Sequence, residues 1–139
     1  MVCLRAEQGR FADASQDGRK AEGPALLDLT MQAIQASLDG LAARQRITAA
    51  NLANSETPGY TAQTISFEDS LASAISAEQP GGTEVTTGYT SDPQNLSGNN
   101  VSVDEETLNA VDTGLRYQLA TQSMNAKFKL LSSSIRFGG

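Results

Sequence analysis

Hydrophobic residues recur at helical spacing over residues 25–54. They are separated alternately by four and three residues, which aligns them on one face of a helix. The pattern predicts one long amphipathic helix whose seam becomes polar toward its end. Gly40, in its interior, is disfavoured by about 1 kcal/mol relative to Ala, and we attribute it to close helix packing. The seam comprises Leu27, Met31, Ile34, Leu38 and Leu41, and the same steps continue through Gln45, Thr48 and Leu52.

A second long helix is predicted over residues 102–136. Ser102 and Glu105 have the spacing of a capping box, and acidic residues in the first turn suit the positive end of the helix dipole. The apolar positions shift in phase partway along, which indicates contact with more than one neighbouring helix or a local stutter. The first stripe is Leu108, Val111, Leu115 and Leu119, and the second is Met124, Phe128, Leu131 and Ile135.

Residues 61–100 are predicted to form a small polar insert between the two helices. A short helix is expected around residues 67–75 with Ser66 as its N-cap, and a short strand at residues 85–89. The remainder of residues 80–100 is rich in Gly, Asn, Ser and Thr, which is typical of loop.

The predicted fold class is mainly α: two long terminal amphipathic helices that pair as an antiparallel coiled-coil hairpin, with the irregular insert between them. A pair of helices buries one stripe of each and leaves other apolar positions exposed, so it is marginally stable alone. We therefore expect association with copies of itself or with relatives. The chain divides into a disordered extension (1–24), the N-terminal helix and its corner (25–60), the insert (61–100) and the C-terminal helix (101–139).

The first helix is expected to end in a sharp corner. Pro58 removes a backbone donor and disfavours helical geometry at Thr57, while Gly59 accepts positive φ without steric cost. The corner is either a simple helix end or a rigid surface against which an adjacent subunit packs. Its residues are Asn51, Asn54, Thr57, Pro58, Gly59 and Tyr60.

Composition supports a helical subunit that completes its core by assembly. The 139 residues amount to at most one domain, and 39% hydrophobic content without Trp is thin for a compact core. The net charge of −6 argues against nucleic acid as a partner. Most of the net negative charge lies in the insert, because its acidic residues are not balanced by any Lys or Arg. Cys3 is the only cysteine, which excludes an intrachain disulfide, and residues 1–24 lack the apolar segment of a Sec-type signal.

No pattern of catalytic or metal-binding residues is visible in the sequence. It contains no His and no cysteine pair, and Gly81–Gly82 lacks the strand, helix and Lys of a phosphate-binding loop. Glu105 and Glu106 are interpreted as helix-dipole charges, and Glu68 with Asp69 as a solvated face. We therefore predict no enzymatic activity and no cofactor.

Two segments carry a resemblance to a known family. The corner resembles the Asn-x-x-Asn-x-x-Thr-Pro-Gly-Tyr signature of bacterial flagellar rod and hook proteins. Leu115-Arg116-Tyr117-Gln118 and Lys127-Phe128-Lys129 are similar to the C-terminal segment of the FlgB family of flagellar basal-body rod proteins. The related FlgC family usually has an Arg-Ala-Tyr-type sequence at Leu115–Tyr117, so FlgB is preferred, and a FlgC-type or other axial rod protein is the alternative. The resemblance covers residues 25–139 apart from the loop of the insert.

The resemblance implies a structural subunit of the proximal rod, the part of the shaft that transmits torque from the MS ring to the hook. It also implies export through the flagellar type III apparatus without a cleaved signal, into the basal body. Implied partners are FlgB copies, FlgC, FlgF, FliE and the MS-ring protein FliF, with no nucleic acid and no small-molecule substrate. Assembly would use the seam of the first helix, the corner and, on the second helix, Leu108, Val111, Leu115, Arg116, Tyr117, Phe128, Leu131 and Ile135. From the residues alone, a self-contained helical adaptor that binds one partner helix in a groove is the competing interpretation.

Overall fold

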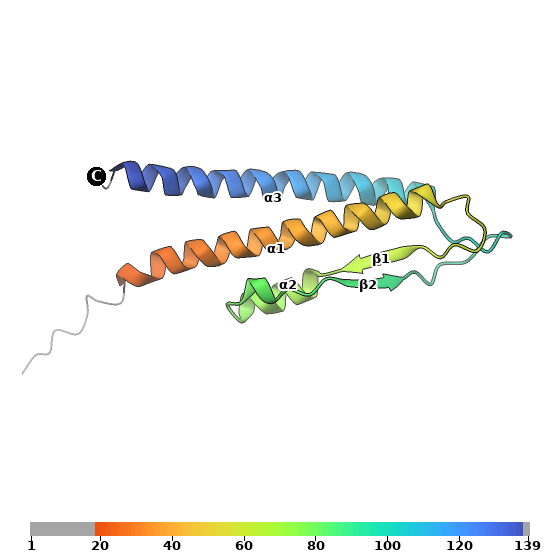
Figure 1. Ribbon diagram of the computed structural model, residues 1–139, viewed down its shortest axis with the longest axis horizontal. Helices are drawn as coiled ribbons and strands as arrows, with labels where there is room; N and C mark the ends of the chain where they lie inside the picture. The colour runs from red at the N-terminus through yellow and green to blue at the C-terminus, as the bar shows by residue number, and fades with distance from the viewer. Residues whose placement is uncertain (1–18, 138–139) are drawn as a thin grey trace, which may run out of the picture.

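The computed structural model describes residues 19–137, and this range is mainly helical (Figure 1). The elements in chain order are α1 (Arg19–Ala53), β1 (Gln63–Ser66), α2 (Glu68–Ser76), the 3-10 turn η1 (Pro80–Gly82), β2 (Thr86–Tyr89) and α3 (Val103–Phe137). Helix α1 is the central element, with α3 along one side and the β1–β2 pair and α2 along the other. Two long terminal helices around a small insert are therefore confirmed, whereas a coiled-coil hairpin is not.

The seam of α1 faces the interior as predicted for most of its length. Leu41 is buried and the seam residues before it are half-buried. Beyond Leu41 the predicted Thr48 is buried, but the predicted Gln45 and Leu52 are exposed, and Asn51 is buried in place of Leu52. The part of the interface nearest the corner is therefore polar.

The face that α3 presents to α1 is largely small or polar. Glu106 and Thr113 are buried, and Ala120, Met124 and Leu131 are half-buried, so the contact follows a seven-residue repeat from Glu106 with a second row through Met124. The first predicted stripe of α3 points elsewhere. The helix is rotated to bring Glu106 onto the polar Asn51 of α1.

We call the apolar residues on the far side of α3 the outer stripe. It comprises Leu108, Val111, Leu115, Leu119 and Leu130. Their side chains are 57–69% exposed, well above the half-buried residues that face α1.

The insert is a two-stranded antiparallel sheet, with α2 and η1 between its strands along the chain. β1 pairs with β2 with Ile65 opposite Thr87. The strand predicted at residues 85–89 is confirmed, but its partner β1 was not predicted. Helix α2 has Phe67 as its N-cap, without a side-chain cap, so the prediction of Ser66 in this role is wrong. The Glu68 carboxylate occupies the first turn instead and accepts a hydrogen bond from the Phe67 N–H at 3.2 Å.

Phe67 is buried against α1 directly over Gly40. A Cβ placed on Gly40 would lie 2.5 Å from Cδ2 of the Phe67 ring, closer than two carbons can approach. Close packing at Gly40 is thereby confirmed, and its cause is an aromatic ring at the start of α2 rather than the α3 backbone.

The helix boundaries differ from the prediction mainly at the N-terminus of α1. Helix α1 begins at Arg19, so residues 19–24 are helical where an unstructured extension was expected. The rest of that extension, with Cys3, lies outside the described residues. Helix α3 begins at Val103, and the Ser102 hydroxyl accepts a hydrogen bond from the Glu105 N–H at 3.4 Å, which confirms Ser102 as its cap.

Candidate assembly site

The corner after α1 is a tight turn with one position that favours glycine. The Tyr60 N–H donates to the Thr57 carbonyl at 3.3 Å, closing a turn with Pro58 and Gly59 in the middle. Gly59 has a φ of 72°, the geometry of a type II turn. The Thr57 hydroxyl donates to the Asn54 side chain at 3.2 Å, which ties the turn to the end of the helix.

Two buried asparagines before α3 hold this corner from the other side. The Asn99 amide donates to the backbone carbonyls of Asn54 and Thr57, both at 2.8 Å. The Asn100 side-chain oxygen accepts from the Ala62 N–H at 2.7 Å. We call Asn99 and Asn100 the latch. Because they immediately precede α3, they fix where α3 starts relative to where α1 ends.

The side-chain amide of Asn51, on α1, forms hydrogen bonds to both β1 and α3. Its nitrogen donates to the Gln63 carbonyl at 2.8 Å and to the Glu106 carboxylate at 2.7 Å. Its oxygen accepts from the Gln63 N–H at 2.9 Å and from the Tyr60 hydroxyl at 3.2 Å. An amide has two donors and two acceptor lone pairs, so no capacity is left over. Tyr60 is therefore folded back onto α1, and its hydroxyl has an intrachain partner.

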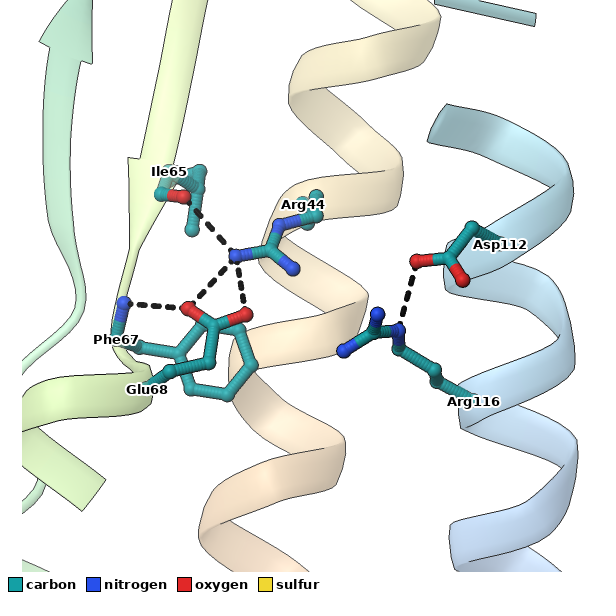
Figure 2. Close-up of polar contacts among 6 residues, drawn as sticks. All are labelled: Arg44, Ile65, Phe67, Glu68, Asp112 and Arg116. Carbon is teal, nitrogen blue, oxygen red and sulfur yellow. Dashed lines mark hydrogen bonds and ion pairs between the residues drawn. The ribbon is translucent and has the colours of Figure 1, made fainter. Parts of the chain in front are cut away.

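Arg44 anchors the insert to α1 (Figure 2). Its guanidinium donates to the Ile65 carbonyl at 3.1 Å and forms an ion pair with Glu68 at 2.6 Å. It also lies over the Phe67 ring, 5.0 Å from the ring centroid, which is within range of a cation–π interaction. One side chain thus contacts the end of β1, the N-cap of α2 and its first residue.

This arrangement changes the acidity of Glu68. Partial burial raises the pKa of its carboxyl, but the hydrogen bond from Arg44, backbone N–H groups at the start of α2 and the Arg44 charge together lower the pKa by more. The pKa of Glu68 therefore lies below its usual value. Glu68 is exposed, as predicted, but it is in addition the ion-pair partner of Arg44.

Two hollows adjoin these contacts. An apolar groove of about 450 Å³ lies between α1, α2 and α3, with Leu41, Phe67 and Leu71 among its lining. A more polar pocket of about 240 Å³ lies between α1, β1 and α3 and includes Thr48 and Glu106. Only the groove has the character of a helix-binding surface.

The residues expected to carry assembly divide into three sets. The seam of α1 is used inside the subunit, and the corner residues are committed largely to intrachain hydrogen bonds. On α3, Phe128 and Ile135 are exposed and Leu131 is half-buried, while Arg116 pairs with Asp112 on the same helix at 2.7 Å (Figure 2). The outer stripe, like Phe128 and Ile135, is left largely exposed by the described structure.

Sequence reasoning missed Arg44, Phe67 and the latch. Their sequence signals are weak: an arginine in a polar part of the seam, an aromatic residue before a short helix, and Asn99-Asn100 in a loop. A pair of adjacent asparagines before a helix cap is a recognisable turn signal, but its partners across the chain are not.

Within residues 19–137, no group of three or more His, Cys, Asp or Glu side chains is placed to hold a metal ion. None of the helices that the structure describes is long and apolar enough to cross a membrane.

Comparison of the sequence with known proteins identifies the class of protein. The family model for "Flagella basal body rod protein" matches residues 32–61, which span the second half of α1 and the corner. The class that this match defines is that of the flagellar basal-body rod proteins.

Similar proteins identify the family within this class. The FlgB rod protein of Bacillus subtilis (strain 168) is 30% identical over 124 residues, covering 78% of this chain and 95% of that protein. FlgB of Salmonella typhimurium (strain LT2) is 29% identical and FlgB of Escherichia coli (strain K12) 27% identical, each over 133 residues that cover 81% of this chain and 96% of the relative. The chain belongs to the FlgB family, which confirms the resemblance drawn from the corner and α3.

Proposed function

We propose that this chain, by its family a structural rod subunit of the flagellar basal body, functions in the proximal rod and acts through assembly alone. The observation that carries the proposal is the outer stripe of α3. Contiguous exposed apolar surface is uncommon on a monomer and marks an interaction site. A rod subunit needs such a surface, because neighbouring subunits must supply the core that two helices cannot build by themselves.

The latch gives the subunit a mechanical role in this proposal. It ties the end of α1 to the segment before α3 through short hydrogen bonds that the buried side-chain amides of Asn99 and Asn100 donate or accept. Torque entering through one helix would therefore pass to the other without changing their relative position at the corner. No chemistry is required for this role, and we propose none.

The proposed neighbours are copies of the same chain, FlgC, FlgF, FliE and the MS-ring protein FliF. We also propose export through the flagellar type III apparatus without a cleaved signal. These assignments rest on membership of the FlgB family, and the exposed surfaces of α3 are where such neighbours would dock.

The test uses Leu115, whose side chain is 63% exposed and lies on the outer stripe. In cells that lack their own FlgB, Leu115→Asp is expected to abolish swimming and to remove the protein from isolated basal bodies. Thr121→Asp, at an exposed position of the same helix outside the stripe, introduces the same charge and is expected to leave swimming intact.

Expression and helix content of both variants should match the unchanged protein, measured by immunoblot and by circular dichroism. Normal swimming with Leu115→Asp would contradict assembly through the outer stripe. Rescue of cells that lack FlgC instead of FlgB would favour the FlgC-type alternative.

The groove between α1, α2 and α3 favours one other candidate, a self-contained adaptor that binds a single partner helix. Such an adaptor would form a discrete one-to-one complex and would tolerate Leu115→Asp. The same variant therefore separates the two functions.

A further inference from the structure

The polar pocket between α1, β1 and α3 is lined by three side chains that carry oxygen atoms and are almost fully buried. Glu106, Thr48 and Thr113 are 9%, 5% and 1% exposed, and they come from both long helices. The volume of the pocket, about 240 Å³, exceeds the ~30 Å³ that one water molecule occupies in the liquid. The pocket therefore has room for part of a ligand as well as for water.

The oxygens of these side chains are not used up within the subunit. Glu106 accepts a hydrogen bond from Asn51 through Oε1 at 2.7 Å. No hydrogen bond in the described part of the chain involves Oε2 of Glu106 or the hydroxyl of Thr48 or Thr113, and yet no fully buried side-chain oxygen there lacks a partner. The three oxygens are therefore accessible, and the hollow that all three residues line is the polar pocket.

Glu106 is a buried charge with no ion-pair partner in the part of the chain that the structure describes. Burial of a carboxylate is costly unless the charge is compensated. Arg44 lines the same pocket but pairs with Glu68, and Asp112 at the rim pairs with Arg116. The helix dipole favours an acid in the first turn of α3 but does not require it to be buried. The charge of Glu106 is thus left for a group from outside the chain.

The lining of the pocket favours an alkylammonium group as this ligand. An ammonium group carries a positive charge and three N–H donors, which matches the three free oxygens in number. Ile47 and Ile65 also line the pocket and are half-buried, and such apolar surface suits the methylene chain next to an ammonium group. The described residues offer no cluster of three or more His, Cys, Asp or Glu, so they provide no comparable site for a metal ion.

We propose that the polar pocket binds a primary ammonium group on an alkyl chain, through Glu106 and the hydroxyls of Thr48 and Thr113. Lysine side chains and free alkylamines both carry such a group. In the assembled rod, a lysine of an adjacent subunit is the expected source. That source rests on the proposed rod function, whereas the ammonium site itself does not.

The first experiment titrates the purified full-length chain with n-butylammonium chloride, which has the charged end and the methylenes of a lysine side chain. Proton–nitrogen correlation NMR is expected to show saturable shifts centred on Thr48, Glu106 and Thr113. Tetramethylammonium chloride, which has the same charge but no N–H donor, and KCl should give no saturable shifts at the same concentration. No saturable shift with n-butylammonium, or an equal one with tetramethylammonium, would overturn the proposal.

The second experiment uses substitutions that keep the shape of the lining. Glu106→Gln keeps an acceptor for Asn51 and removes the charge, so the affinity for n-butylammonium should fall about tenfold or more. Thr113→Val removes one hydroxyl at nearly constant size and should lower the affinity about threefold or more. Thr113→Val also keeps the proposal testable if Glu106→Gln does not fold. Unchanged affinity in every folded variant would refute the site.

Glu105→Gln is the matched control, because Glu105 is exposed in the same first turn and the substitution changes the net charge equally. Its affinity for n-butylammonium is expected to equal that of the unchanged chain. An equal fall in Glu105→Gln and Glu106→Gln would indicate long-range attraction to an acidic helix end instead of binding in the pocket, and the proposal would then be wrong.

Isolated basal bodies distinguish the two sources of the ammonium group. In cells that lack their own FlgB, Glu106→Gln is expected to reduce incorporation and Glu105→Gln to leave it unchanged. Normal incorporation of a Glu106→Gln chain that binds n-butylammonium weakly would exclude a neighbouring lysine and assign the site to a free amine. If Leu115→Asp swims normally while n-butylammonium binds in the pocket, assembly through the outer stripe fails and the site stands. The reverse pair of results overturns the site alone.

Discussion

At the scale of single residues, Gly40 and Gly114 differ in whether packing requires a glycine at that position. Both lie inside long helices, where glycine is disfavoured. A Cβ on Gly40 would collide with the Phe67 ring at 2.5 Å, whereas a Cβ on Gly114 would meet no atom within 4 Å. Packing against α2 therefore requires the glycine in α1, and nothing in the subunit requires the one in α3.

Alanine substitution at the two sites should have opposite effects. Gly40→Ala is expected to lower the free energy of unfolding by about 1–3 kcal/mol, because Phe67 must move. Gly114→Ala should raise it by about 0.5–1 kcal/mol through helix propensity. Urea titration followed by circular dichroism measures both, and a stabilising Gly40→Ala would contradict the packing of Phe67.

The lowered pKa of Glu68 predicts how the stability of the fold depends on pH in acid. Its pKa is lower in the folded protein than in the unfolded chain, whose reference value is 4.5. The ion pair with Arg44 therefore contributes its full stability above this reference value, and the contribution is lost as the pH falls through the folded-state pKa. The difference in unfolding free energy between the unchanged protein and Glu68→Gln should shrink as the pH falls from about 6 to about 3.

Asp69→Asn is the control for this titration, since Asp69 is the exposed neighbour of Glu68 and has no ion pair in the described part of the chain. Its difference from the unchanged protein should vary much less over the same pH range. A Glu68→Gln difference that does not change with pH would refute the role of the Arg44 ion pair.

At the scale of elements, the insert is held to α1 by backbone groups of β1 as much as by side chains. Asn51 bonds both the N–H and the carbonyl of Gln63, so its side chain takes the place of a neighbouring strand at that edge of the sheet. Arg44 does the same for the Ile65 carbonyl two residues further along. A strand of four residues is positioned in this way on a helix rather than within a larger sheet.

Asn51→Ala should therefore loosen three elements together. It leaves the Glu106 carboxylate and the Gln63 backbone without their partner in a buried place, which costs about 2–4 kcal/mol. Asn54→Ala, which removes bonds within the end of the helix and its turn, should cost less than about 1 kcal/mol. Urea titration of the two variants tests the contrast, and equal losses would deny Asn51 its central role.

Local patterns predicted the long helices, the Ser102 cap and the strand ending at Tyr89, because each depends on residues close together in sequence. The same patterns missed β1, whose pairing depends on residues at least twenty positions away. They also left the inner face of α3 unidentified, since apolar spacing cannot reveal a buried contact built from Asn51 and Glu106. The rotation of α3 that exposes the outer stripe follows from this polar contact.

At the scale of the whole molecule, α1 is packed on two sides and α3 on one (Figure 1). The inner side of the α1–α3 pair forms contacts within the subunit, and the outer side of α3 is exposed. Membership of the FlgB family was predicted from motifs on both helices and confirmed by relatives that align over most of the chain. The surfaces used between subunits are proposals that rest on exposure and charge.

The polar contact between the long helices also constrains the order in which the molecule can fold. The hydrogen bond from Asn51 to Glu106 joins residues 55 positions apart, and the bond from Asn99 to Asn54 spans 45. Closing such loops costs chain entropy before any contact is gained, which slows folding. A chain that emerges from a channel with its N-terminus first presents α1 long before α3. The native pairing of the two helices therefore begins only when most of the chain has emerged.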